Sequence, residues 1–243
     1  MVYRMTLTPM LEEYEKDLRL SPAGILKIFE NAGNRHAAAV GDSVADCLAR
    51  GEAWLLTDWY VEIYTRTPMG RDVRVETFCR KGERTAGMRR DFRMRDEENN
   101  LIALATSKWA KVTVEEKRLL RVDADVLEQY DALPASILGE LPIPPRHGPL
   151  PTTNEVPIAL RRVDFDMYDH VHNLQYLDYA LEAVPQHVCA ARSVRAFHIA
   201  YVRSITAGEQ VVAKCAEIEG GYAVFIEADG ELAATVDIFT DHT

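Results

Sequence analysis

Strand-like runs rich in apolar residues make up much of the chain, and two stretches of helical spacing interrupt them. The first helical stretch follows Ser21 and Pro22, residue types that suit a helix N-cap and a first helical position. The second ends at Pro185, which cannot continue a helix. We therefore predict helices near residues 22–40 and 173–184 in a chain that otherwise consists mainly of strands.

A run of strand-like segments follows each predicted helix. Polar and apolar residues alternate over residues 87–96, which is typical of a sheet with one solvated face. The predicted strands are 53–65, 72–83, 87–96 and 101–112 after the first helix, and 196–202, 209–219, 222–228 and 232–240 after the second. One more strand is predicted before each helix, the later one over residues 157–166.

The prolines divide the chain into two similar parts. Most of them lie between Pro134 and Pro157, where neither a helix nor a central strand can continue. We predict an N-terminal unit over 1–133, an extended proline-rich linker over 134–157, and a C-terminal unit over 158–243. An offset of 148 residues aligns the apolar positions of the two helices, and the repeated order of elements favours a duplicated unit. A single helix and an antiparallel sheet bury their apolar faces best when the sheet curls around the helix.

Composition narrows the classes of function. The 243 residues carry a formal net charge of −10, which disfavours non-specific binding to nucleic acid or to an anionic membrane. The chain contains no apolar run of about 18 residues, so no membrane span is predicted. The first ten residues lack the apolar core of a signal peptide, and a cytoplasmic location is expected. The four cysteines form no C-x-x-C pair, and we expect buried thiols in a reducing compartment: Cys47, Cys79, Cys189 and Cys215.

One segment carries a more specific signal. Residues 164–185 have the sequence DFDMYDHVHNLQYLDYALEAVP, which resembles the motif Asp-x-Asn-x-His-Val-Asn-Asn-x-x-Tyr of the acyl-acyl-carrier-protein thioesterases in the hotdog superfamily. Residues 53–80, 87–96 and 103–112 also resemble that family, in the same order and spacing. The resemblance implies an α+β double hotdog fold of two tandem units, each with an antiparallel sheet around a central helix. It also implies hydrolysis of fatty acyl-acyl-carrier protein to free fatty acid, as in fatty acid biosynthesis.

The motif is matched in part. Asp166 and His170 stand at the positions of the family aspartate and histidine, and Asn173 and Tyr176 match its second asparagine and its tyrosine. Tyr168 replaces the first asparagine of the motif. The resemblance therefore assigns catalytic roles to Asp166 and His170, with Tyr168 as a substitute for the asparagine.

Two further family positions differ. His172 stands at the asparagine position before Asn173. The family also has a glutamate, often followed by cysteine, on a strand after the second helix, and alignment on Tyr201 places Ser204 and Ile205 there. Because the segment AYVRSIT has no carboxylate, a protein that binds acyl groups without hydrolysing them is an alternative to the enzyme.

The chemistry of thioester hydrolysis requires an activated water and hydrogen-bond donors for the oxyanion. Asp166 precedes the predicted second helix, whose free N–H groups would favour both a carboxylate and an oxyanion. Asp166 is therefore expected to activate water or to attack the thioester directly. The alternative is that Asp166 only caps the helix, or pairs with Arg161 or Arg162.

His170 and Tyr168 each have more than one interpretation. His170 could orient water, act as a general base or polarise the thioester; otherwise it is a polar loop residue, or a metal ligand with His172 and Asp169. No further cluster of Cys and His completes a metal site, and no metal or other cofactor is predicted. The Tyr168 phenol could donate to the oxyanion, or its ring could narrow the site.

Substrate contacts are predicted at both ends of the acyl-carrier substrate. Trp54 and Trp59 could line an apolar channel for the acyl chain, although such residues are more often plain core. Asn173 is also predicted to contact substrate, and it is expected to support the start of the second helix and not to perform chemistry. Between residues 71 and 95, nine basic residues stand against four acidic ones. Arg89, Arg93 and Arg95 are expected to share one exposed strand face that docks acidic acyl carrier protein, the alternative being an ordinary solvated face.

The sequence is also compatible with other activities that occur on the same fold. An acyl-CoA thioesterase would share the chemistry and differ in the carrier, and hydratases share the fold, so fold alone cannot decide the reaction. The partner implied by the resemblance is acyl carrier protein with its acyl-phosphopantetheine arm. Acyl chain length and homodimer formation are not determined by these patterns.

Overall fold

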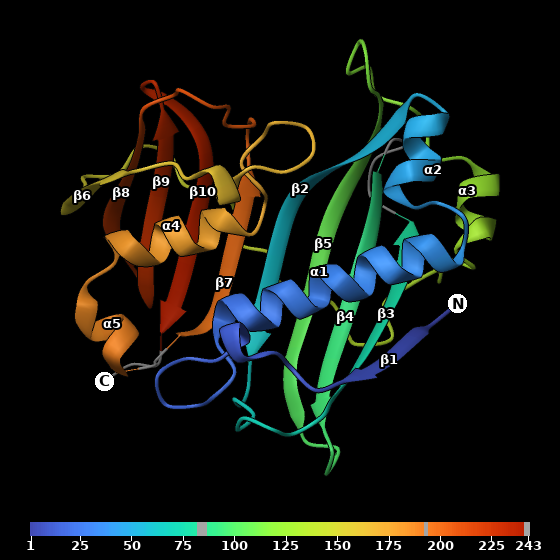
Figure 1. Cartoon of the computed structure of the whole chain (residues 1–243), viewed down its shortest axis with the longest axis horizontal. Coiled ribbons are helices and arrows are strands. Elements are labelled where there is room, and N and C mark those ends of the chain that lie inside the picture. Colours follow the sequence, from blue (N-terminus) through green and yellow to red (C-terminus); the bar gives the residue numbers. More distant parts are fainter. Residues whose placement is uncertain (82–86, 192–193, 241–243) are drawn as a thin grey trace. The chain divides into compact units, whose positions relative to one another are not determined.

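The computed structural model describes residues 1–81, 87–191 and 194–240, and the chain divides into two compact units. Unit 1 is Met1–Pro142 and unit 2 is Ile143–Thr243. In each unit a helix lies against the strands (Figure 1). The division falls inside the proline-rich segment, and the more detailed boundaries of the linker at 134 and 157 stay a prediction.

Unit 1 contains the strand order β1-β3-β4-β5-β2, and every neighbouring pair is antiparallel. Its described elements are β1 (Tyr3–Leu7), the 3-10 turn η1 (Leu11–Glu13), α1 (Pro22–Ala39), α2 (Val44–Ala49), β2 (Glu52–Ile63), β3 (Val73–Lys81), β4 (Gly87–Asp96), β5 (Leu101–Thr113) and α3 (Ala124–Gln129). The predicted strands of this half are confirmed to within a few residues at each end, whereas the short helix α2 was not predicted.

Unit 2 repeats this arrangement with the order β6-β8-β9-β10-β7, again antiparallel throughout. Its described elements are β6 (Asn154–Ile158), the 3-10 turn η2 (Arg162–Asp164), α4 (Gln175–Ala183), α5 (Gln186–Ala191), β7 (Val194–Tyr201), β8 (Val211–Ile218), β9 (Gly221–Ala228) and β10 (Glu231–Thr240). The expected strand over 157–166 is wrong beyond Ile158. There the Asp164 carboxylate accepts from the backbone N–H of Arg161 at 2.8 Å, a local bond that favours a turn over a strand.

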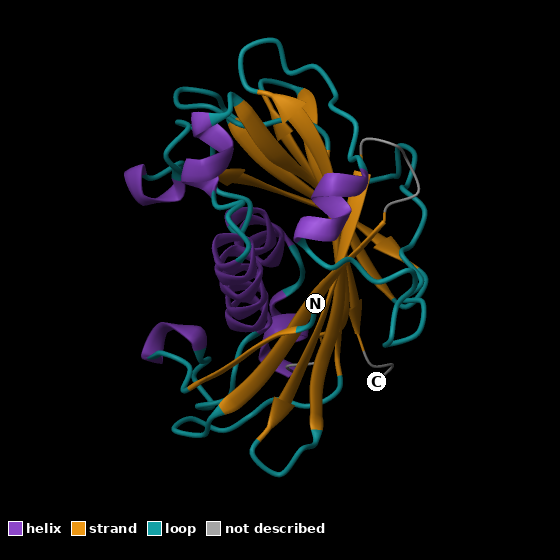
Figure 2. Ribbon diagram, turned by 90° about the vertical axis from the view of Figure 1, so that its right-hand side faces the viewer, coloured by secondary structure: helices purple, strands orange, loops and turns teal. Residues whose placement is uncertain are grey.

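The long helix of unit 1 begins where the sequence predicts. The Ser21 hydroxyl accepts from the Gly24 N–H at 2.8 Å, and Pro22 occupies the first helical position. The apolar face of α1 is fully buried against the sheet, and the side view in Figure 2 shows the curvature of the strands. The buried residues of this face are Ile25, Leu26, Ile28, Phe29 and Ala32.

Helix α4 occupies the same place in unit 2, but the correct offset between the two helices is 151 residues, not 148. Leu26 corresponds to Leu177, because the buried positions of α4 are Tyr176, Leu177, Tyr179, Ala180 and Ala183. The two offsets differ by three residues, which is close to one helical turn. Apolar stripes that recur every three to four residues can therefore be superimposed at either offset, and only the tertiary packing distinguishes them.

The proline-rich segment contains no described helix or strand between residues 134 and 153. In unit 1 the Glu140 carboxylate lies 3.1 Å from the Arg80 guanidinium. In unit 2 Leu150 packs on an apolar cluster of Ala216, Ala223 and Phe225. The segment is therefore attached to each unit by its own side-chain contacts, as expected for a chain rich in proline that cannot join the sheets.

Two further sequence predictions concern the cysteines and membrane-spanning segments. Cys47, Cys79 and Cys215 are buried free thiols, whereas the Cys189 side chain lies outside the described residues. Among the described residues, no helix combines the length and apolar character that crossing a membrane requires.

Candidate active site

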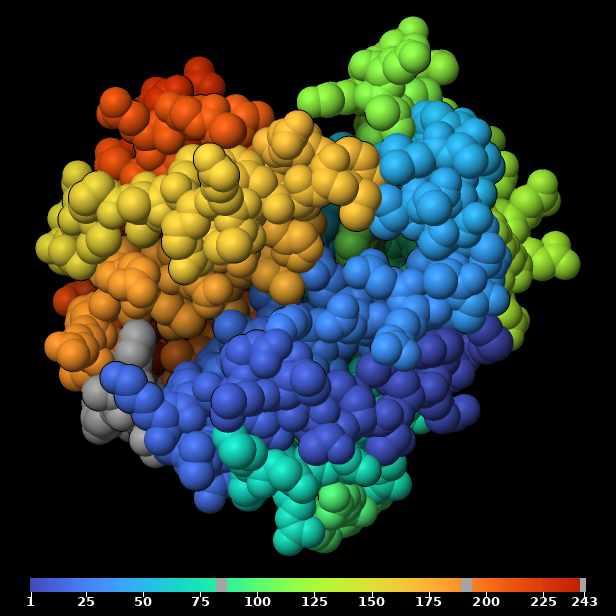
Figure 3. Space-filling view, in the orientation of Figure 1, coloured from blue at the N-terminus to red at the C-terminus, as the bar shows by residue number. Residues whose placement is uncertain are grey.

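The predicted catalytic residues lie on a short loop of unit 2 that precedes α4. Phe165 and Val171 pair across its base, and the Asp166 N–H donates to the His170 carbonyl at 2.8 Å. Asp169 adopts a left-handed φ of 57°, which Asp tolerates better than most residues. The loop is therefore a tight turn that places Asp166 and His170 opposite each other. In the space-filling view its segment lies at the surface (gold in Figure 3).

The Asp166 carboxylate is held by this turn and not by a helix. Its Oδ1 accepts from the backbone N–H groups of Tyr168 at 2.8 Å and His170 at 3.2 Å. Helix α4 begins only at Gln175, so the expected N–H groups of a helix terminus do not contact Asp166. Aspartate commonly accepts from the backbone just after it in such turns. Because these two N–H groups bind the carboxylate, they are not available to an oxyanion.

A second turn lies beside this loop. His170 pairs with Thr206, and the Val171 N–H donates to the Ile205 carbonyl at 2.9 Å. Ser204 therefore lies next to the residues that contact the loop. His170 and Asp166 are half-buried, while Ser204 and Thr206 are exposed.

Sequence reasoning missed Glu209, a carboxylate of this second turn. Its Oε2 accepts from the Thr206 N–H at 2.5 Å and from the Thr206 hydroxyl at 3.1 Å, and its Oε1 lies 2.7 Å from the Arg203 guanidinium. Burial opposes ionisation, but the hydrogen bonds from Thr206 and Arg203 outweigh it and lower the pKa of Glu209. The signal in the sequence was Gly208, whose φ of 93° turns the chain back on Thr206.

The fully buried carboxylate of this region is Asp164, which was also missed. It accepts from the Tyr179 hydroxyl at 2.9 Å and from Arg161 Nε at 3.0 Å. Burial raises the pKa of Asp164, but the hydrogen bonds from Arg161 and Tyr179 prevail and hold it below its usual value. Arg161 therefore pairs with Asp164, and the expected alternative of an Arg161–Asp166 pair is wrong.

Tyr168, Asn173 and Tyr176 differ in their surroundings. Tyr168 is 40% exposed, so its ring lies at the surface of the loop. Asn173 accepts through its backbone carbonyl from the Tyr201 hydroxyl at 2.9 Å. Leu174 occupies the N-cap position of α4, so Asn173 does not act as its N-cap. Tyr176 is buried, and burial raises the pKa of its hydroxyl to about 12.

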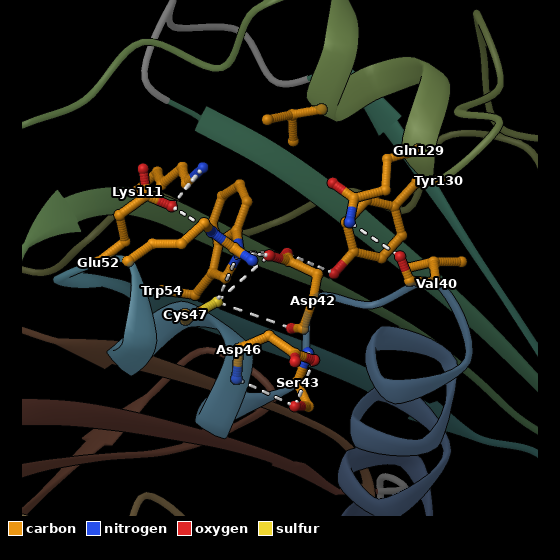
Figure 4. A network of polar contacts seen from close by, with 12 residues as sticks. Val40, Asp42, Ser43, Asp46, Cys47, Glu52, Trp54, Lys111, Gln129 and Tyr130 are labelled. Carbon is orange, nitrogen blue, oxygen red and sulfur yellow. Dashed lines mark hydrogen bonds and ion pairs between the residues drawn. The ribbon is translucent and has the colours of Figure 1, made fainter.

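The two tryptophans predicted to contact the acyl chain are both in unit 1 but have different roles. Trp59 is fully buried, and its ring centroid lies 4.9 Å from that of Phe92. Trp54 belongs to a polar network around the buried Asp42 carboxylate, shown in Figure 4. Asp42 accepts from the Trp54 indole at 2.8 Å and from the Tyr130 hydroxyl at 2.8 Å. Trp54 is therefore fixed by a structural contact, and acyl contact at either tryptophan stays a prediction.

The predicted docking face is only partly exposed. Arg89, Arg93 and Arg95 do share one face of β4, but Arg89 is 8% exposed, which contradicts its predicted exposure. Arg89 lies opposite Arg80 on β3, where the proline-rich segment meets the sheet: Leu133 pairs with Arg80, and the Glu140 carboxylate lies 3.1 Å from the Arg80 guanidinium. Arg93 binds Glu76, with Nε at 2.7 Å, and Arg95 donates to the Asn99 carbonyl at 2.7 Å. Residues 83 and 84 of the basic segment lie outside the described residues.

Metal ligation was a minor alternative for His170. Within residues 1–81, 87–191 and 194–240, no group of three or more His, Cys, Asp and Glu side chains is arranged to hold a metal ion.

Comparison with protein families identifies both halves of the chain. Residues 2–130 match the acyl-ACP thioesterase N-terminal domain, and residues 149–238 match the C-terminal domain of the same family. The chain belongs to the acyl-ACP thioesterase family. The resemblance inferred from the loop motif is thereby confirmed.

Curated relatives in this family come from plants. The chloroplastic oleoyl-acyl carrier protein thioesterase 1 of Arabidopsis thaliana is 27% identical over 195 residues, which cover 74% of this chain and 54% of that protein. The chloroplastic dodecanoyl-[acyl-carrier-protein] hydrolase of Cinnamomum camphora is 23% identical over 91% of this chain and 60% of that protein. The chain thus spans about half the length of the curated relatives it matches. The cytoplasmic location expected for this chain stays a prediction.

Solved structures confirm the α+β double hotdog fold. The 12:0-ACP thioesterase from Umbellularia californica has a TM-score of 0.86 at 20% identity, covering 99% of this chain and 97% of that one. An acyl-ACP thioesterase from Bacteroides thetaiotaomicron has a TM-score of 0.87 at 17% identity, covering 99% and 98%. At these identities the likeness establishes the fold, and the roles of individual residues must be argued from the site itself.

Proposed function

We propose that this protein hydrolyses the thioester between a fatty acyl chain and the phosphopantetheine arm of acyl carrier protein. Water attacks the thioester carbonyl, the carbon–sulfur bond breaks, and free fatty acid and the carrier thiol are released. The observation that carries this proposal is the Asp166 carboxylate, held on a half-exposed turn beside His170 in a member of the acyl-ACP thioesterase family.

Asp166 has the geometry of a general base. Its Oδ1 is occupied by two backbone N–H groups, and its Oδ2 has no hydrogen-bond partner among the described residues. An anionic oxygen that is oriented by its neighbour and open to solvent can accept a proton from an attacking water. His170, on the same turn, would orient that water or polarise the thioester, and a proton must finally reach the departing thiolate.

The oxyanion needs donors other than the Tyr168 and His170 N–H groups, which already bind Asp166. The Tyr168 phenol, at the exposed surface of the loop, supplies one O–H donor and is our candidate for that role. Contact of the acyl chain with Trp54 or Trp59 stays a prediction. Docking of acidic carrier protein is assigned to Arg93 and Arg95, without Arg89.

A matched pair of substrates tests the proposal. Acyl-acyl-carrier protein and acyl-CoA with the same acyl chain should both be offered, and free fatty acid should be measured over time. Faster turnover of the carrier-protein ester is expected. Preference for the CoA ester would indicate an acyl-CoA thioesterase. Binding without hydrolysis would favour the non-catalytic alternative, which rests on the absence of the family's first asparagine and of its glutamate from the expected positions.

A further inference from the structure

The catalytic loop of unit 2 has a counterpart in unit 1 with the same backbone. Tyr14 pairs with Leu20 as Phe165 pairs with Val171. The Glu15 N–H donates to the Arg19 carbonyl at 2.9 Å, as the Asp166 N–H donates to the His170 carbonyl at 2.8 Å. An offset of 151 residues relates all these pairs, so Glu15 occupies the position of Asp166, and Arg19 that of His170.

The neighbouring turn is duplicated as well. The Leu20 N–H donates to the Thr67 carbonyl at 2.9 Å, which reproduces the bond between Val171 and Ile205. Arg19 pairs with Pro68 as His170 pairs with Thr206. The residue just before the accepting carbonyl is Arg66 in unit 1 and Ser204 in unit 2. The two units therefore differ in charge at the turn position just before this carbonyl.

Arg66 binds the loop carboxylates of unit 1. Its Nη2 lies 2.7 Å from Glu15 Oε2 and 3.7 Å from Asp17 Oδ1, and its Nε donates to the Leu20 carbonyl at 2.8 Å. The guanidinium therefore occupies the Glu15 Oε2 oxygen, which is not open to a hydrogen bond from an attacking water. Arg19, at the histidine position, has no acceptor nitrogen at all. The loop of unit 1 thus has the same backbone hydrogen bonds as the loop of Asp166, but it has neither an unpaired carboxylate at this position nor a histidine.

Asp166 has no such partner. In the described part of the chain, no Lys, Arg or His side-chain nitrogen lies within 4 Å of its carboxylate oxygens. The arginine next to position 204 is directed elsewhere, because Arg203 binds Glu209 at 2.7 Å and donates to the Ala228 carbonyl. In unit 1, Arg66 reaches Glu15 from the turn position that corresponds to Ser204. In unit 2, the small and neutral Ser204 does not reach Asp166 in this way.

We propose that Ser204 is a determinant of hydrolysis at this site because it leaves the Asp166 carboxylate without a cationic partner. The loop of unit 1 is the inactive counterpart, closed by Arg66. Ser204 itself contacts no reacting atom in this scheme. It acts indirectly, because its small, neutral side chain does not fill the space beside Asp166 that an arginine would fill. This inference rests on the proposed function, in which Asp166 accepts a proton from water.

The test converts the site of unit 2 into that of unit 1. Ser204→Arg should pair with Asp166 and lower kcat on acyl-acyl-carrier protein at least 10-fold, since loss of general-base assistance typically costs about 10²–10⁴-fold. Ser204→Gln is the matched control, with comparable reach and no charge, and should stay within about 3-fold of the wild type. The fold should tolerate both substitutions, because unit 1 accommodates arginine at this position on the same backbone.

A second measurement detects the ion pair without any substrate. The effect of Ser204→Arg on Tm should be more favourable by about 1–3 °C in the wild-type background than in the Asp166→Asn background, as expected for a partly exposed ion pair. Ser204→Gln should have the same effect on Tm in both backgrounds.

The outcomes separate the two proposals. Unchanged kcat in Ser204→Arg, an equal loss in Ser204→Gln, or equal Tm effects in both backgrounds would each overturn the role of Ser204. Failure of the wild-type protein to hydrolyse any thioester would overturn the proposed function, and the Tm comparison would then still decide whether position 204 controls the pairing of Asp166.

Discussion

Asp166 and Asp164 are two residues apart and have different chemistry because their surroundings differ. Asp164 is fully buried and bound to Arg161 and Tyr179, so it stabilises the start of the loop. Asp166 is half-buried, and among the described residues its carboxylate is bound only by backbone N–H groups, on one oxygen. A carboxylate with a free oxygen can accept a proton, whereas one saturated by charged donors is held as a stable anion.

Replacement of Asp166 by asparagine is the direct test of its role. Asp166→Asn keeps an oxygen that can accept from the Tyr168 and His170 N–H groups but removes the base, so a loss of roughly 10²–10⁴-fold in kcat is expected. Asp169→Asn is the matched control, because this exposed residue of the same loop has a left-handed φ that asparagine also tolerates. Circular dichroism and thermal melting should show both variants folded. Full thioesterase activity in Asp166→Asn would remove Asp166 from the mechanism.

His36 gives the protein a defined response to acid. It is fully buried on α1, and burial, reinforced by the nearby Arg90 charge, lowers the pKa of His36 to about 3. The unfolded chain binds this proton at a pKa of about 6.5, so the folded state loses stability as pH falls from about 6.5 toward 3. Below about 3 the histidine is protonated in both states, and no further loss arises from it.

The expected size of this effect follows from the linkage relation. One proton bound only by the unfolded state changes the unfolding free energy by about 1.4 kcal/mol per pH unit. In His36→Gln, which retains an acceptor for Arg90, the dependence of unfolding free energy on pH between 6 and 4 should be shallower by up to that amount. Urea unfolding at several pH values measures it, and identical slopes in both proteins would contradict the assignment.

At the scale of elements, the start of α1 depends on close contact with the 3-10 turn η1. A Cβ atom at Gly24 would lie 2.3 Å from the Glu13 carbonyl oxygen, closer than atoms can approach. Glu13 is itself buried, and its carbonyl accepts from the Ser21 N–H at 2.9 Å. Glycine at position 24 therefore allows the helix to begin directly beside the turn that leads into the loop of unit 1.

Gly24→Ala should destabilise the protein although alanine is the better helix former. The expected loss is about 1–3 kcal/mol from overpacking, reduced by up to about 1 kcal/mol of helix propensity. Gly33→Ala, on the same helix, is the control: its Cβ would meet the nearest atom, in Arg90, at an ordinary 3.4 Å. Chemical denaturation of the two variants should show a lower stability for Gly24→Ala. Equal stabilities would contradict this prediction and would show that η1 can shift to make room for the added methyl group.

At the scale of the whole molecule, the net charge of −10 disfavours approach of an acidic carrier protein unless a local basic surface compensates. Two of the three predicted docking arginines stay at least partly exposed. Glu76 neutralises the charge of Arg93. Arg95 donates to a backbone carbonyl at 2.7 Å, a neutral partner that does not compensate the arginine charge. Arg95 is thus the better candidate for contact with the carrier.

Charge reversal at Arg95 tests this docking surface. Arg95→Glu should raise KM for acyl-acyl-carrier protein several-fold at low ionic strength, with a smaller effect near 0.5 M salt, because exposed charges are screened there. Acyl-CoA turnover should change less. Arg121→Glu, an exposed arginine elsewhere in unit 1, carries the same change in charge and serves as the control. An equal effect of both variants, or one independent of salt, would argue against docking at Arg95.

Most elements of the fold follow from local patterns in the sequence. Ser21 and Pro22 place the start of α1, Pro185 limits α4, and alternating residues define β4, because capping, backbone restriction and side-chain period are local properties. The motif around Asp166 and His170 likewise identified the family. These features were predictable because each depends on neighbours within a few residues.

Tertiary structure decided which side chains meet. Burial of Arg89, the bond from Tyr179 to Asp164 and the bond from Tyr201 to the Asn173 carbonyl join segments that are distant in the sequence. The offset of 151 residues between the units and the correspondence of Arg66 with Ser204 emerged from backbone hydrogen bonds. Amphipathic periodicity repeats at every helical turn and cannot fix such an offset, whereas packing and hydrogen bonding are specific to one register.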